Sequence, residues 1–198
     1  MFAGSRKRFV AASYTERPLT RSPPHNGVMA NPVFDAVRTI MAIRDYQQKP
    51  IPADVVTRIV DAGRLTASAA NHQEWHFVVV REPENLRALG SLVKTGPYIA
   101  KSMLAIVVAY EKNSRTGVSD CSRAIQSMLL TAWGEGVGSN WTGFGSLEDV
   151  RNKVSLPDRY EVIAVLPFGY PARPVKGRKK RKPLSEVASA ERFGAPLA

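Results

Sequence analysis

The alternation of hydrophobic and polar positions becomes regular at Asn31 and predicts two helices in succession. Asn31 is a favourable capping residue and Pro32 suits a first helical position, so one helix should begin here and end near Ala42. Pro52 should open the second helix. One face of each helix carries hydrophobic residues at helical spacing, namely Val33, Val37, Ile40 and Met41 in the first and Val55, Val56, Ile59 and Val60 in the second.

Three hydrophobic runs further along the chain predict strands. Residues 75–80 (WHFVVV) have the composition of a buried strand, and residues 103–110 (MLAIVVAY) carry apolar side chains that would face both ways. The third run, YEVIAVLPF, covers residues 160–168. These runs predict a small sheet with at least one strand covered on both faces.

Helices are predicted between and after these strands. Pro83 should start a short helix, and Ser119 should cap a long one whose apolar face spans residues 125–133 before a run of glycines. Ser146 with Asp149 resembles the capping box of another short helix. The irregular alternation of helices and strands indicates an α+β domain, with a small mixed sheet flanked by helices and a long central helix.

Composition excludes several classes of protein. The chain has 198 residues, 44% of them hydrophobic and 23% charged, which suits one domain with a real core. Its longest apolar runs fall short of the roughly 18 residues that a membrane span needs, so no membrane association is expected. A single cysteine, Cys121, and three scattered histidines argue against a disulfide scaffold or a metal site.

The net charge of +11 is concentrated at the two ends of the chain. Residues 1–28 carry five Lys or Arg against one Glu, residues 173–198 carry eight against two acids, and the middle is close to neutral. A duplex-binding domain would spread its bases over one folded face, so nucleic acid is not expected as a partner. We expect a disordered basic extension over 1–28, a domain over 29–190, a tail over 191–198 and a cytoplasmic protein; whether 1–28 is a targeting segment or precedes a true start at Met29 stays open.

Candidate chemistry lies in the loop ahead of the first strand. Ser68, Asn71 and Gln73 precede Trp75 and the buried run that follows it. Donors and acceptors held at the edge of a sheet suit a planar heteroaromatic ligand. The alternative is an ordinary turn, with Asn71 as a cap and Trp75 in the core.

Four segments taken together resemble one family. This loop, IRDYQQKPIP (43–52), GVGSNWTGF (136–144) and the stretch from FGYP to KRKPLSEV (168–187) occur in the order found in the nitroreductase family of FMN-dependent oxidoreductases, over about 29–190. The resemblance implies a nitroreductase-like fold and a homodimer with FMN at the subunit interface. It also implies hydride transfer from NADH or NADPH through flavin N5 to a nitroaromatic, a quinone or a similar acceptor.

The resemblance also implies where the cofactor binds. Arg44 corresponds to a basic residue beside the flavin, whereas Ile40 and Met41 stand where the family usually has a basic pair. Their absence should weaken FMN binding or shift the phosphate contact elsewhere, and Arg38 is a possible substitute. Lys179 and Arg181 are our choices for the phosphate, with the other bases of the run as surplus solvated charge.

The remaining positions are carried over in the same way. Ser68, Asn71 and Gln73 match the family's cofactor loop, which would usually serve the other subunit, although Ala67 and Glu74 replace its two prolines. The loop therefore lacks two preset φ values. Thr142 and Gly143 match the segment whose backbone N–H approaches flavin N5, with no side chain required as catalyst.

Three alternatives to a nitroreductase activity remain open at the level of sequence. One is another reductive chemistry within the same fold, and a second is a flavin-binding protein without turnover. The third is a basic module that binds nucleic acid, which predicts salt-sensitive binding and no yellow colour. Cys121, Tyr98 and Trp141 are expected to be packing residues.

Overall fold

Four strands form one antiparallel sheet in the computed structural model, which describes residues 31–145, 147–177 and 179–197. Their order across the sheet is β1-β2-β4-β3, with β1 at Trp75–Val80, β2 at Leu104–Glu111, β3 at Gly138–Ser139 and β4 at Tyr160–Gly169. The sequence predicted a mixed sheet, but the only parallel pairing among the described residues is an isolated bridge between Ala42 and Ser139. The α+β class is confirmed. The basic extension 1–28 and the capping residue Ser146 lie outside the described residues.

Strand β2 is the centre of the core. Val107 pairs with Val78 on β1 and with Val165 on β4, and β2 is buried along nearly its whole length. Its alternate residues enter two different hydrophobic clusters, Leu104, Ile106, Val108 and Tyr110 on one face and Ala105, Val107 and Ala109 on the other. Both faces are therefore covered, as the apolar run predicted.

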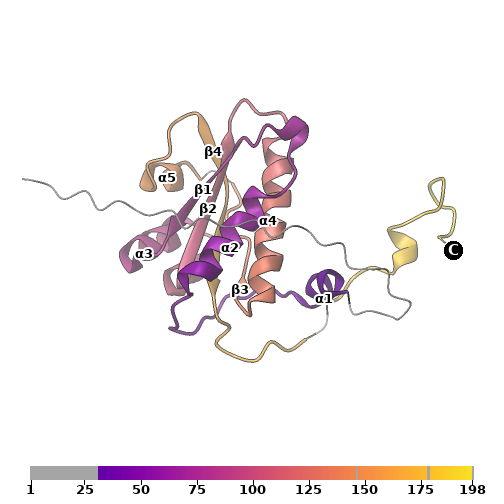
Figure 1. Ribbon diagram of the computed structural model, residues 1–198, viewed down its shortest axis with the longest axis horizontal. Coiled ribbons are helices and arrows are strands. Elements are labelled where there is room, and N and C mark those ends of the chain that lie inside the picture. Colours follow the sequence, from indigo (N-terminus) through magenta and orange to yellow (C-terminus); the bar gives the residue numbers. More distant parts are fainter. Residues whose placement is uncertain (1–30, 146, 178, 198) are drawn as a thin grey trace, which may run out of the picture. The chain divides into compact units, whose positions relative to one another are not determined.

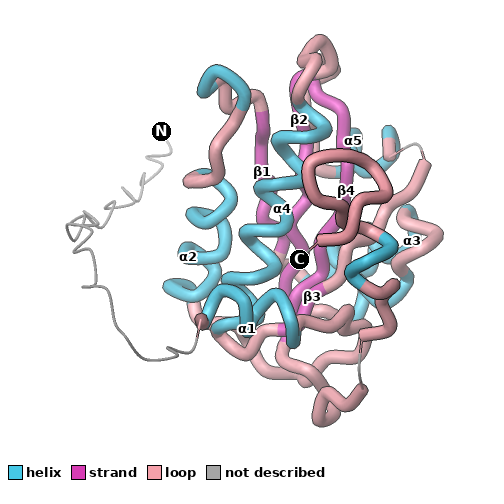
Figure 2. Tube along the Cα trace, turned by 90° about the vertical axis from the view of Figure 1, so that its right-hand side faces the viewer, coloured by secondary structure: helices cyan, strands magenta, loops and turns pink. Residues whose placement is uncertain are grey.

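Helices cover the two faces of the sheet. α2 (Ala53–Arg64) and α4 (Gly117–Gly134) lie on one face, and α3 (Pro83–Leu92) and α5 (Glu148–Lys153) on the other (Figure 1). Figure 2 shows α2 and α4 side by side in front of the sheet. Gly63 on α2 suits this close approach, because a Cβ there would lie 3.1 Å from Met128 Cγ and 3.3 Å from Phe77 Cζ. α4 is the long central helix that the sequence predicted.

The first helix ends earlier than predicted. α1 covers Pro32–Thr39, and the chain then extends, so that Ile43 N–H donates to Ser139 O at 2.9 Å. Gly138 permits this approach, because a Cβ there would lie 2.5 Å from Ile43 Cγ1. Pairing with the edge of the sheet is therefore favoured over continuation of the helix, although the helical pattern of apolar residues runs on through Ile40 and Met41.

Two other sequence predictions need correction. α4 begins at Gly117 rather than after a cap at Ser119, whose hydroxyl donates to Thr116 O at 3.2 Å from inside the first turn. β1 is an edge strand rather than a fully buried one, with His76 exposed and Val79 40% exposed. An apolar composition alone does not distinguish an edge strand from a central one.

The remaining described elements are short 3-10 helices at Ala69–Asn71 (η1), Pro97–Lys101 (η2) and Leu184–Glu186 (η3). Within the described ranges, no helix has both the length and the apolar character required to traverse a bilayer.

Candidate functional site

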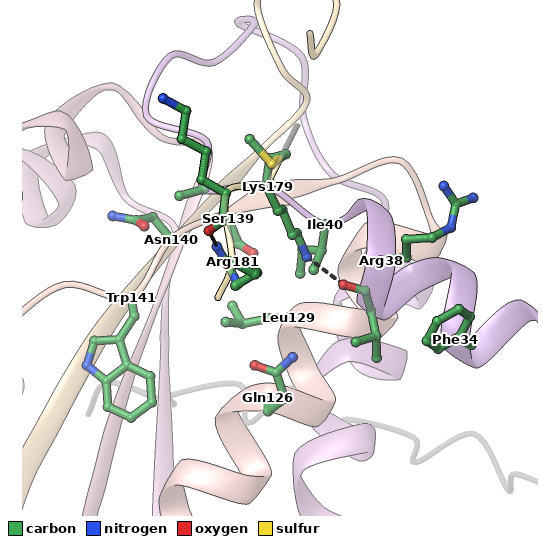
Figure 3. Close-up of a pocket in the computed structure, with 14 residues that line it drawn as sticks. Phe34, Arg38, Ile40, Gln126, Leu129, Ser139, Asn140, Trp141, Lys179 and Arg181 are labelled. Carbon is green, nitrogen blue, oxygen red and sulfur yellow. Dashed lines mark hydrogen bonds between the residues drawn. The ribbon is translucent and has the colours of Figure 1, made fainter. Parts of the chain in front are cut away.

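A cavity of about 980 Å³ opens between α1, α4, the 139–141 segment and the basic run near the C-terminus (Figure 3). Its apolar lining comes from Phe34, Val37, Ile40, Met41, Ala42, Leu129 and Trp141. Its polar lining comes from Arg38, Gln126, Ser139, Asn140, Lys179, Lys180 and Arg181. An apolar wall with several bases at one side suits a ligand that has both a flat ring system and an anionic group.

Lys179 and Arg181 both line this cavity, as the phosphate assignment requires. Lys179 Nζ donates to Val37 O at 2.5 Å, in the last turn of α1. Burial lowers the pKa of Lys179, and the charge of Arg181 lowers it further. Two like charges are thus held together where a bound anion would relieve their repulsion.

The bond between Lys179 and Val37 also bears on the missing basic pair. Ile40 and Met41 follow Val37 within a few residues and line the same cavity. The ammonium group of Lys179 therefore lies beside the end of the helix that leads to those two positions. A lysine from the basic run near the C-terminus therefore lies close to Ile40 and Met41, the two positions at which a basic residue is missing.

Arg38 fits the substitute role less well than Lys179. Its guanidinium is paired with Asp35, with Nη2 to Oδ1 at 3.0 Å, and it points away from Lys179 in Figure 3. The pair is exposed, and such pairs exchange readily with solvent. Arg38 lines the cavity but would have to reorient to meet an anion there.

Arg44 lies outside the cavity. It lines a neighbouring hollow of about 240 Å³, which shares Met41 and Ala42 with the cavity. Its guanidinium carbon is 5.8 Å from the centre of the Tyr98 ring, and the Tyr98 hydroxyl accepts a hydrogen bond from Asn140 Nδ2. Tyr98 thus links Arg44 to the cavity wall.

Asn140 lines the cavity but is not among the residues predicted from the sequence. It is only 8% exposed and lines the cavity together with Ser139 and Trp141. The GVGSNWTGF segment pointed to the right stretch of chain, but the periodicity of a two-residue strand is too short to show which side chains face inward.

Thr142 and Gly143 follow this wall but do not line the cavity. Thr142 is built into the sheet: its N–H and hydroxyl donate to Val165 O at 3.2 and 2.8 Å. Gly143 has a φ of +97°, which favours glycine, and its N–H donates to Thr95 Oγ1 at 3.3 Å. The partner of Gly143 is a side-chain hydroxyl, whereas Thr142 and Val165 bond each other through both backbone groups, so Gly143 is the stronger candidate for a backbone contact with a ligand.

The loop with Ser68, Asn71 and Gln73 lies at the other end of α4 from the cavity (Figure 1). It contacts Asp120, whereas the cavity-lining residues of α4, Gln126 and Leu129, follow six and nine residues later, about 9 and 13 Å along the helix. The loop closes on itself, because Gln73 N–H donates to Ser68 Oγ at 3.0 Å and Gln73 Nε2 donates to Asn71 O at 3.2 Å. Within one chain, the loop and the cavity are therefore two separate surface regions.

Cys121 is buried beside β2, with Sγ 3.6 Å from Ala109 O. Burial, and secondarily the charge of Asp120, raises the pKa of its thiol to about 12. It is a packing residue, as expected. Across the described part of the chain, no group of three or more His, Cys, Asp or Glu could hold a metal ion.

Comparison with known proteins identifies the class. The model of the nitroreductase family matches residues 37–117 and 104–170. A relative from Methanothermobacter thermautotrophicus, which carries the provisional name NADH dehydrogenase/NAD(P)H nitroreductase, is 36% identical over 71% of this chain and 78% of its own. The chain therefore belongs to the nitroreductase family and is an oxidoreductase.

Solved structures agree with this assignment. A structure from Bacteroides thetaiotaomicron with the same provisional name has a TM-score of 0.76 and 27% identity, covering 83% of this chain and all of that one. An FMN-dependent nitroreductase from Clostridium difficile R20291 has a TM-score of 0.75 and 22% identity over 81% of this chain and 99% of that one. The second comparison supports the fold alone.

Proposed function

We propose that this chain binds FMN in the cavity and uses NADH or NADPH to reduce a small oxidised acceptor, such as a nitroaromatic or a quinone. The observation that carries the proposal is the meeting of Lys179 and Arg181 with an apolar wall in one cavity. The cavity is near the upper end of the usual range of about 300–1,000 Å³ for ligand sites, which is the size expected for a large ligand such as a flavin nucleotide.

The two-electron chemistry at N5 would be supplied by the bound FMN. The chain would supply binding and position. Lys179 and Arg181 would hold the phosphate through charge-assisted hydrogen bonds. Met41, Leu129 and Trp141 would pack on the ring system and exclude water. Gly143 does not line the cavity, so its N–H would meet the negative charge that develops on the ring only after giving up its bond to Thr95 Oγ1.

We also propose that the working unit is a homodimer. None of Ser68, Asn71 and Gln73 lines the cavity of its own chain, so their contact would go to the cofactor of a second copy. Apolar side chains are available for such an interface, with Phe34 on α1 61% exposed and Phe193 near the C-terminus fully exposed. Stable homodimer interfaces are rich in such residues.

Steady-state kinetics test the proposed activity. The full chain, with and without added FMN, is assayed for oxidation of NADH and of NADPH in the presence of a soluble quinone or a nitroaromatic. FMN-dependent oxidation that follows the acceptor concentration supports the proposal. Tight binding of FMN without oxidation of either nicotinamide would contradict it and would indicate a flavin-binding protein without turnover.

A further inference from the structure

We propose that Asp120 and Glu74 are positioning residues that anchor the two ends of the 68–73 loop and so shape it for the cofactor. This inference rests on the proposed function, in which that loop contacts FMN. Neither residue is itself expected to touch the ligand. The two carboxylates would take over the role of the two prolines that this loop lacks, at Ala67 and Glu74.

Asp120 anchors the first end of the loop. Its side chain is 3% exposed, and Oδ2 accepts a hydrogen bond from Ala69 N–H at 3.1 Å, directly after Ser68. Oδ1 accepts from Arg123 Nη2. A buried carboxylate bonded to a backbone N–H makes a strong, directional contact, because an ionised acceptor strengthens the bond.

Glu74 anchors the second end. Its Oε2 accepts from Ser114 Oγ at 2.5 Å, and its own carbonyl accepts from Glu111 N–H at 3.0 Å. Ser114 Oγ in turn accepts from Thr116 N–H at 3.3 Å. The loop therefore ends on the turn between β2 and α4, at the same end of α4 that carries Asp120.

The loop needs such anchors because its backbone is strained. Ala70 and Gln73 have φ values of +46° and +55°, in the left-handed region that most side chains with a Cβ disfavour, whereas Asn71 at +59° is a residue type that tolerates it. Such conformations persist only where surrounding contacts determine them. Asn71 and Gln73 are both exposed on this loop.

A simpler role for Asp120 would be stabilisation of α4 alone, since acidic residues favour the first turn of a helix. That role would not require the carboxylate to be buried or bonded to a residue 51 positions away in the chain. The two roles differ in what a substitution changes. A helix role alters the stability of the whole domain, whereas an anchoring role alters the order of the loop and the affinity for FMN.

The test compares Asp120→Asn and Ser114→Ala with a matched control, Asp149→Asn, which removes an exposed acid from the first turn of α5. Hydrogen–deuterium exchange of the loop is measured without FMN, and the dissociation constant for FMN is measured by fluorescence quenching. We expect both variants to exchange the Ala69 region faster and to bind FMN roughly tenfold more weakly, while the control does neither. Ser114→Ala leaves both carboxylates in place, so it remains informative if Asp120→Asn folds poorly.

Two results would overturn the inference. Exchange and FMN affinity that match the control would show that neither contact orders the loop. Faster exchange with unchanged FMN affinity would show that the anchors have no role in cofactor binding. A wild type that binds no FMN would instead refute the proposed function, and the exchange data would then still report whether Asp120 holds the loop.

Discussion

Removal of the Lys179 charge should weaken FMN binding more than removal of a neighbouring charge in the same basic run. Lys179→Met keeps the length of the side chain and removes its ammonium group. A hydrogen bond to a charged partner contributes about 1.5–3 kcal/mol. Since Lys179 is only half-buried, solvent screening reduces this, and about 1.4 kcal/mol corresponds to a tenfold rise in the dissociation constant.

The same substitution has a second, smaller consequence. Lys179 Nζ also donates to Val37 O, so its loss leaves a carbonyl in the last turn of α1 to water. A net contribution of about 0.5–1.5 kcal/mol is typical of such a bond. α1 should therefore fray slightly in the variant, which thermal unfolding by circular dichroism would detect as a small decrease in midpoint.

The assay is quenching of FMN fluorescence at low and at high ionic strength. Lys182→Met is the matched control, because Lys182 belongs to the same run but does not line the cavity. The wild type and the control should bind FMN equally well and lose affinity as salt screens the phosphate contact, whereas Lys179→Met should bind about tenfold more weakly at low salt. Equal affinities for the two variants would refute the placement of the phosphate.

Three further outcomes follow from the packing and the charges. Gly138→Ala should destabilise the fold, because its Cβ would lie 2.5 Å from Ile43 Cγ1; chemical denaturation should show a loss of more than about 1 kcal/mol. Cys121 should resist thiol reagents at pH 8 until the chain unfolds, because burial raises its pKa to about 12. Burial alone would raise the pKa of Asp120, but the bonds from Ala69 and Thr116 and the charge of Arg123 outweigh it and lower this pKa. A carboxyl group whose pKa is lowered by folding stabilises the fold above its unfolded pKa of about 3.9. That stabilisation is lost as the pH falls through the folded pKa, so the free energy of unfolding of Asp120→Asn should depend less on pH below pH 4 than that of the wild type.

The sequence predicted the parts of the fold that depend on long hydrophobic periodicity. The strand at 75–80, the doubly covered strand at 104–111 and the long central helix all lie where the pattern indicated. These elements bury many apolar side chains in regular positions, so the pattern carries the same information as the packing. Single contacts over a long sequence distance are different, and the early end of α1 is the clearest case. Its cause is the pairing of Ile43 with Ser139, which no local pattern records.

The sequence indicated several of the residues that line the candidate site, but not how they are arranged. Lys179 and Arg181, the two bases chosen from their run, both line the cavity, but so does Lys180 between them. The motif could not show that Arg44 lies in a neighbouring hollow against Tyr98, or that Asn140 lies in the cavity wall. Those placements depend on how the extended segment after α1 meets β3. The roles of all these residues in cofactor binding stay predictions.

The most direct test of the central proposal is the visible absorption spectrum of the full chain with one equivalent of FMN, recorded anaerobically before and after addition of NADH or NADPH. We expect bound flavin bands that bleach with at least one nicotinamide and return when a quinone or a nitroaromatic is added. A spectrum that remains that of free FMN, or bound bands that neither nicotinamide bleaches, would contradict it.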